Sequence, residues 1–169
     1  MMRWRTPLAA LGLCLCTGHV DPAGLSFNGR ALGERVDSVL DDARYECGGL
    51  SACLLYTVCT LKLPGSETLA GAPLEALSLH FGGERLTAIE ARFAPAQFDR
   101  VLAELTLEHG PGQSAASAMR RGFPGSAGNT VYVWRQGHQL LRLERFSRDP
   151  TRSSLIVSEQ SFLGELLDQ

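Results

Sequence analysis

Three cysteines stand at equal intervals in the stretch ECGGLSACLLYTVC, which covers residues 46–59. Five residues separate Cys47 from Cys53, and five separate Cys53 from Cys59. Thiols in such an arrangement serve as metal ligands, as reactive nucleophiles or as disulfides, and the redox compartment favours one of these chemistries over the others. The chain contains no Cys-x-x-Cys pair, so the spacing is atypical of zinc binding and of redox catalysis.

The four histidines offer a second source of chemistry. His19, His80, His109 and His138 form no His-x-x-x-His pair, and we therefore expect neither a metal site nor a cofactor. His109 falls in the last turn of a predicted helix, where a cation is favourable. His80 and His138, with a strand carboxylate, are the candidates for a hydrolytic or ligand-binding site, provided that the fold brings them into one pocket.

The serines and carboxylates match no catalytic motif. The segment 125–128 (GSAG) is one residue shorter than Gly-x-Ser-x-Gly, and it precedes a predicted strand where a nucleophile needs a helix. Glu90 and Glu144 lie within predicted strands, and we expect Glu144 to pair with Arg135 or a neighbouring arginine across strands. The sequence therefore favours structural ion pairs over acid catalysis.

The first residues predict export. Arg3 and Arg5 precede an apolar run at 7–16, and cleavage after Gly18 fits the small residues there, so residues 1–18 are predicted to be a signal peptide. A lipid anchor on Cys14 or Cys16 is the less favoured alternative, because a leucine precedes Cys14. Cleavage would leave 14 basic and 18 acidic residues, a net charge of −4, which disfavours a nucleic-acid partner.

Export places the cysteines in an oxidising compartment, where paired cysteines usually become disulfides. Gly48-Gly49 lets the chain turn back, and we predict that Cys47 pairs with Cys59. Cys53 is then either a buried free thiol or a competitor in a Cys47–Cys53 or Cys53–Cys59 pair, because spacing alone does not choose.

Hydrophobic periodicity and turn residues define the elements that must position these groups. We predict helices over 32–43 and 95–109, and strands over 54–62, 67–71, 77–81, 86–93, 129–136, 139–146 and 152–160. A Gly- and Ser-rich loop is expected over 110–128, and a short helix or strand end over 161–168.

This order predicts an α+β protein with an antiparallel sheet of about six to seven strands, covered by two main helices. The elements follow the order helix, strands, helix, strands, and the two halves repeat that order with only weak sequence similarity. We expect a short N-terminal linker at 19–26, followed by a single domain over 27–169.

Two groups of aromatic and arginine residues are candidate binding surfaces, since these residue types dominate binding hot spots. The first is Tyr132 and Trp134 on one predicted strand with Arg142 on the next. The alternative, which we favour for Trp134, is that it fills the core beneath a helix. The second group lies in the long loop and consists of Arg120, Arg121 and Phe123.

Several motifs together resemble small exported proteins of Gram-negative bacteria: FNGRALGERVDSVL, ETLAGAP, LHFGGERLTAI, EHGPG, the strand with Trp134, LLRLERF and SSLIVS. The resemblance covers residues 27–160. More distantly, the helix-and-sheet repeats are similar to the β-lactamase inhibitor protein fold and to small lipoproteins of outer-membrane assembly. Those families act through protein surfaces, so the resemblance implies no catalytic residue.

We therefore expect a non-catalytic periplasmic or secreted protein that binds another envelope or secreted protein. One alternative is a small exported hydrolase or ligand-binding protein that uses His80 and His138. The other is an inhibitor of an exogenous enzyme that inserts hairpin turns such as Gly82-Gly83.

Overall fold

The computed structural model describes residues 26–48, 56–115, 129–146 and 150–159. The elements of the first half are β1 (Ser26–Phe27), β2 (Arg30–Ala31), α1 (Asp37–Leu40), β3 (Tyr45–Gly48), β4 (Tyr56–Leu61), η1 (Pro64–Ser66), β5 (Thr68–Leu69), β6 (Ala72–Gly82) and β7 (Arg85–Phe93). Those of the second half are η2 (Pro95–Gln97), α2 (Phe98–His109), β8 (Gln113–Ser114), β9 (Val131–Gln136), β10 (Gln139–Glu144) and β11 (Ser153–Glu159).

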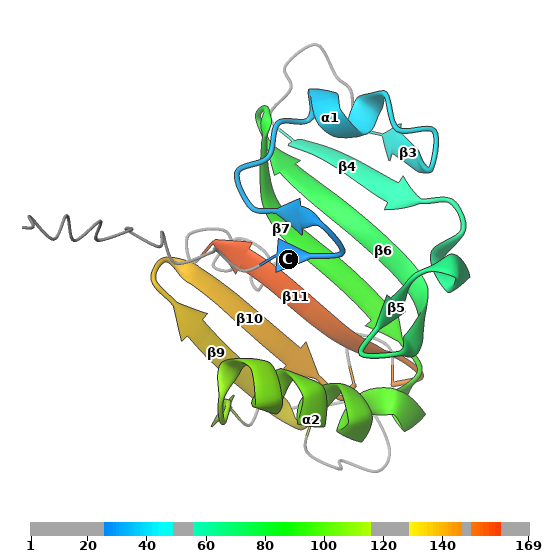
Figure 1. Cartoon of the computed structure of the whole chain (residues 1–169). Coiled ribbons are helices and arrows are strands. Elements are labelled where there is room, and N and C mark those ends of the chain that lie inside the picture. Colours follow the sequence, from blue (N-terminus) through cyan, green and yellow to red (C-terminus); the bar gives the residue numbers. More distant parts are fainter. Residues whose placement is uncertain (1–25, 49–55, 116–128, 147–149, 160–169) are drawn as a thin grey trace, which may run out of the picture.

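In these residues the dominant element is a nine-stranded antiparallel sheet (Figure 1). The strand order is β3-β4-β6-β7-β11-β10-β9-β8, and β5 pairs with β6. β1 and β2 form a separate hairpin. The predicted α+β class with antiparallel pairing is confirmed, whereas the expected six to seven strands and two main helices are wrong in number.

The second predicted helix is present as α2, preceded by the 3₁₀ turn that contains Pro95. Phe98, Val101 and Leu105 are buried and form its apolar stripe. Gly110 ends the helix with a φ of 76°, a left-handed conformation that glycine adopts without strain. The helical spacing of apolar residues and the Gly-Pro pair at its end were therefore sufficient to predict this helix.

The first predicted helix, 32–43, is mostly not helical, and in this half a strand hairpin precedes the short helix. Gly33 has a φ of 85°, and its N–H donates to the carbonyl of Leu86. The N–H of Val36 donates to the carbonyl of Glu84 in the same way. Because this segment pairs with the start of β7, only Asp37–Leu40 remains for the helix. A tertiary contact has overridden the helical period.

Four of the described strands were not predicted, namely β1 and β2 of the hairpin, β3 and β8. β3 has only four residues and follows the turn after α1, and β8 lies at the start of the expected loop 110–128. Both are held by their neighbours: β3 pairs with β4, and the N–H of Ala115, just past β8, donates to the carbonyl of Val131 at 2.8 Å. Strands this short carry too little periodicity to be found in the sequence.

The core lies on one face of the sheet, which we call the helix face. One hydrophobic cluster joins the sheet to residues of the β1–β2 hairpin, of α1 and of α2, such as Phe27, Val39 and Phe98. The hairpin and both helices accordingly lie on the same side in Figure 1. The opposite side of the sheet is called the far face below.

The sheet order is symmetric about its central pair, β7 and β11. β4-β6-β7 lie on one side of this junction, and β11-β10-β9 lie on the other. The last strand of each half therefore pairs with the last strand of the other half, which joins the two halves into one sheet.

Candidate functional site on the far face of the sheet

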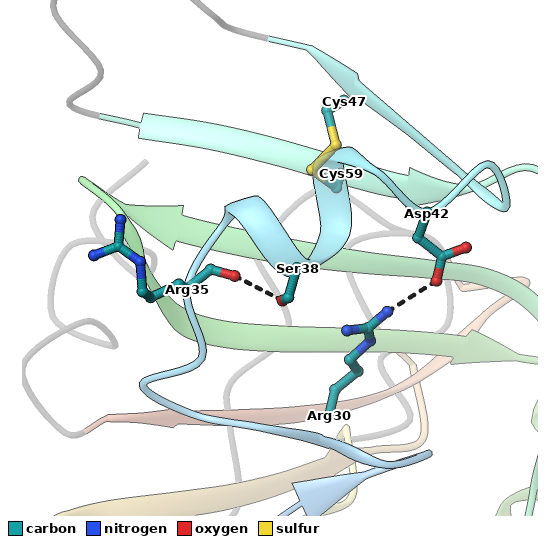
Figure 2. Close-up of a disulfide and its surroundings, with 6 residues drawn as sticks. All are labelled: Arg30, Arg35, Ser38, Asp42, Cys47 and Cys59. Atoms are coloured by element: carbon teal, nitrogen blue, oxygen red, sulfur yellow. Dashed lines mark hydrogen bonds and ion pairs between the residues drawn. A yellow bond between two sulfur atoms is a disulfide. The ribbon is translucent and has the colours of Figure 1, made fainter.

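The predicted disulfide between Cys47 and Cys59 is confirmed. The two residues lie directly opposite each other on β3 and β4, with their Cα atoms 3.9 Å apart. Cys59 is fully buried in the core on the helix face, and the bond lies close to α1 (Figure 2). It joins the neighbouring strands β3 and β4. Cys53 lies outside the described residues.

An arginine–carboxylate network lies near the disulfide on the helix face. Arg30 donates to Asp42 at 2.9 Å and to Glu34 at 2.5 Å, and Arg44 donates to Asp42 at 2.7 Å (Figure 2 shows Arg30 and Asp42). Hydrogen bonds from Arg44, helped by the charge of Arg30, lower the pKa of Asp42 to about 2. These contacts tie the β1–β2 hairpin to the turn after α1, so this cluster is structural.

The residues of the first expected binding surface do not share a face of the sheet. Trp134 is 6% exposed on the helix face, and its Nε1 donates to the carbonyl of Gly110 at 2.8 Å. Tyr132 packs on the same face beside Phe98, with ring centroids 6.4 Å apart. Arg142 points to the far face, because it alternates with core residues along β10. Tyr132, Trp134 and Arg142 therefore do not form one binding surface.

Other expectations fall outside the described residues. They concern the signal peptide at 1–18, the lipid-anchor alternative at Cys14 or Cys16, and the loop residues Arg120, Arg121 and Phe123.

The structure does not bring His80 and His138 together. His80 lies on β6, whereas His138 lies in the turn between β9 and β10, three strand spacings away through β7 and β11. At 4.7–4.9 Å per spacing this is roughly 14 Å, too far for two groups to act on one atom. A site that combines the two histidines is not formed.

His80 instead meets a strand carboxylate on the far face. Alternation along the strands places seven polar side chains on one side of β3, β4, β6 and β7. Six of them are exposed or partly exposed, and His80 is buried. This polar patch consists of Glu46, Tyr56, Thr60, Ser78, His80, Glu90 and Arg92. Further along the far face, residues of β9, β10 and β11 such as Val131, Leu140 and Ser158 are buried.

A row of interacting side chains crosses the centre of the polar patch. Tyr56 Oη is hydrogen-bonded to His80 Nδ1, and His80 Nε2 lies 3.8 Å from Glu90 Oε2. Arg92 donates two hydrogen bonds of 2.8 and 3.1 Å to the same carboxylate. His80 is 9% exposed, whereas Tyr56 is 42% exposed. These contacts therefore link the exposed phenol of Tyr56, through the buried imidazole of His80, to Glu90 and the partly exposed Arg92.

Glu90 is ionised in this arrangement. Burial raises the pKa of its carboxyl, but the contacts with His80 and Arg92 outweigh burial and lower the pKa to about 2. Its arginine partner, Arg92, is two residues along the same strand. Glu144, which was expected to pair across strands, likewise forms an ion pair with Arg142, two residues away on β10.

This shift predicts an acid-dependent stability. The carboxyl of Glu90 releases its proton more easily in the folded protein than in the unfolded chain, whose pKa is near 4.5. Its contribution is therefore present above about pH 4.5 and is lost as the pH falls toward 2. Between pH 6 and pH 2.5 the wild-type protein should therefore lose more unfolding free energy than Glu90→Gln does. We expect a difference of about 2 kcal/mol, after allowance for solvent screening at the partly exposed Arg92. Urea unfolding at both pH values measures this.

The exposed helix carboxylate of Glu104 supplies the matched control, because Glu104→Gln should follow the wild-type pH dependence. Identical pH dependence in Glu90→Gln and wild type would contradict the assigned ion pair.

An open cavity of about 470 Å³ lies elsewhere, beside the end of α2 and β9. Its polar lining is paired internally: His109 lies 3.8 Å from Glu108, and Arg135 donates to Gln113 at 2.7 Å.

Within the described ranges, no group of three or more His, Cys, Asp or Glu side chains is placed to hold a metal ion. The helices in that same part of the chain are too short or too polar to cross a membrane.

The sequence reasoning missed Tyr56, although a signal was present. Residues of a strand alternate between faces, so Tyr56 must face away from the side that buries Cys59. Its neighbour His80 is 24 residues away, and that contact depends on the register between β4 and β6.

Comparison with protein-family models, with curated proteins and with solved structures found no match for this chain. The resemblance to small exported proteins therefore rests on the sequence motifs alone.

Proposed function

We propose that this protein is a non-catalytic binding module of the periplasm or the extracellular space, and that it docks a partner protein on the polar patch. The observation that carries the proposal is the exposed Tyr56, which His80 and Glu90 link to the partly exposed Arg92 on the surface of the sheet. Tyrosine and arginine are enriched in the residues that dominate protein interfaces. The patch also neutralises its own central charges, because Arg92 is already paired with Glu90.

The disulfide supports the compartment in this proposal. A cross-strand disulfide persists in oxidising surroundings, and cytosolic thiols are usually kept reduced. The predicted signal peptide at 1–18 points to the same compartment. We propose an envelope or secreted protein as the partner.

Site-specific photo-crosslinking tests the docking surface. A photoreactive phenylalanine analogue replaces Tyr56, or replaces Leu107, which is 81% exposed on the helix face. In cells that make the protein naturally, we expect a discrete adduct from position 56 and none from position 107. Matching adducts from both positions, or no adduct from position 56, would refute docking at the patch.

A further inference from the structure

The last strand of the sheet leaves part of its neighbour uncovered. β8 pairs with β9 only through Gln113 and Ser114, which lie opposite Val133 and Tyr132. Residues 134–136 of β9 therefore have no partner strand on that side in the described part of the chain. This stretch, which we call the β9 gap, spans about 10 Å at the usual rise of a strand. The open cavity beside the end of α2 lies along it.

The register of β9 directs the backbone of Arg135 into the β9 gap. The N–H of Ala115 donates to the carbonyl of Val131 at 2.8 Å. Alternate residues of an antiparallel strand bond to the same neighbour, so Val133 and Arg135 also present their N–H and carbonyl groups on the side of β8. Continuing this register would place Pro111 opposite Arg135, and proline has no N–H to donate. Among the described residues, no backbone bond reaches Arg135 from that side.

The side chain of Arg135 adds a positive charge at the same place. It is exposed, and its polar partner among the described residues is Gln113, whose neutral oxygen accepts a hydrogen bond of 2.7 Å. By contrast, Arg92, Arg142 and Arg145 each contact a carboxylate. One bond to an amide oxygen occupies one of the five guanidinium donors and leaves the charge uncompensated. Arg135 can therefore bind a carboxylate in addition to Gln113.

The segment 110–112 closes one end of the β9 gap. It connects α2 to β8, and the carbonyl of Gly110 accepts a hydrogen bond of 2.8 Å from Trp134 Nε1. A methyl group on Gly112 would lie 2.7 Å from the indole ring, so the segment is in direct contact with Trp134. A strand that lies in line with β8, antiparallel to β9, must end at this segment. The end that meets the segment is the C-terminus of that strand.

We propose that the β9 gap binds the C-terminal residues of an extended peptide, and that the terminal carboxylate of this peptide pairs with Arg135. The peptide adds to the uncovered edge of β9 as a further antiparallel strand and bonds to the backbone of Arg135. The cavity volume of about 470 Å³ lies within the usual range for ligand sites. The site is at the opposite edge of the sheet from the polar patch and is independent of docking there.

Nuclear magnetic resonance of the whole chain, labelled with nitrogen-15, tests the inference with acetyl-Ala-Val-Ala as the probe. We expect saturable shifts of the Arg135 backbone amide and of the Trp134 indole signal. The same peptide with a C-terminal amide should bind about tenfold more weakly, because it lacks the charged acceptor. Acetate offers a carboxylate without a strand, and it should also bind about tenfold more weakly than the peptide acid.

Four variants assign the charge that recognises the peptide. Arg135→Gln should lower the affinity for the peptide acid about tenfold, and Arg135→Lys should restore part of it. Arg85→Gln is the matched control, because Arg85 is also exposed and donates to a neutral oxygen, the carbonyl of Gly33, outside the cavity. Glu108 is the acidic residue of the lining, so Glu108→Gln should leave the affinity for a carboxylate unchanged or raise it.

Each part of the inference has a result that would overturn it. Equal affinity for the peptide acid and the peptide amide, or equal affinity in wild type and Arg135→Gln, would remove the carboxylate assignment. Weaker binding to Glu108→Gln would indicate a cationic ligand instead. Acetate that binds as tightly as the peptide acid would make this a site for small organic acids and not for a chain end. The absence of a saturable shift up to about 20 mM peptide would remove the site altogether.

Discussion

Trp134→Ala is expected to lower the unfolding free energy by about 3–5 kcal/mol, the usual effect of removing a large aromatic side chain from a core. The indole is 6% exposed on the helix face. It packs beside Tyr132, with ring centroids 6.3 Å apart, and opposite Leu141 on β10. Truncation leaves a cavity that the rigid sheet and α2 fill only in part. Urea unfolding followed by far-ultraviolet circular dichroism measures the loss.

A second substitution separates packing from hydrogen bonding at the same site. Trp134→Phe keeps most of the buried surface but removes the Nε1 donor to the carbonyl of Gly110, for which we expect a loss of about 1–2 kcal/mol including the smaller ring. Leu107→Ala is the surface control and should change stability by less than about 0.5 kcal/mol. If Trp134→Ala keeps its stability but no longer binds a partner protein, Trp134 is a binding residue and not a core residue.

The position of Trp134 shows what alternation in a strand can and cannot establish. Parity alone correctly groups Trp134 with Tyr132 and separates both from Val133. Which of the two faces lies under α2 is decided by packing against Phe98 and Val101, which are distant in sequence. Arg142 has the opposite parity to Trp134 across the β9–β10 register, so the turn length at Gly137 could have separated them.

Elements held by their own sequence were predictable, and elements held by distant contacts were not. The β6–β7 and β9–β10 hairpins and α2 carry local turn or capping residues, and each is present. The segment 33–36 has a helical apolar period, yet its backbone bonds to Glu84 and Leu86. The sequence contains no local record of that pairing.

The candidate site is harder to predict because it is assembled across strands. Glu90 and Arg92 share a strand, and their two-residue spacing predicts one common face. Tyr56 joins them only because β4 lies next to β6 in a register that places Tyr56 opposite Gly82 and diagonal to His80. The sequence did not indicate which strand lies next to β4 or in which register the two strands pair, because neither follows from composition or residue spacing.

Loss of the Cys47–Cys59 bond is expected to cost about 3 kcal/mol, the chain-entropy value for a loop of this length. The comparison should be made in a Cys53→Ala background, so that no third thiol exchanges with the pair. In this background, replacing Cys47 and Cys59 by alanine should lower the urea midpoint without a large change in its slope. Adding a reductant should produce the same decrease in the parent and no change in the double variant. A decrease below about 1 kcal/mol would contradict the expected contribution.

The location of the bond predicts where the weakened protein opens. β3 is the last strand on its side of the sheet and pairs only with β4 among the described strands, whereas β10 and β11 have neighbours on both sides. Without the disulfide, β3 retains its ladder hydrogen bonds and the Arg30–Asp42 contact that holds the preceding turn. We therefore expect amide exchange to accelerate in β3 and α1 before it changes in β10 and β11. Uniform acceleration across the sheet would show instead that the bond stabilises the whole fold as one cooperative unit.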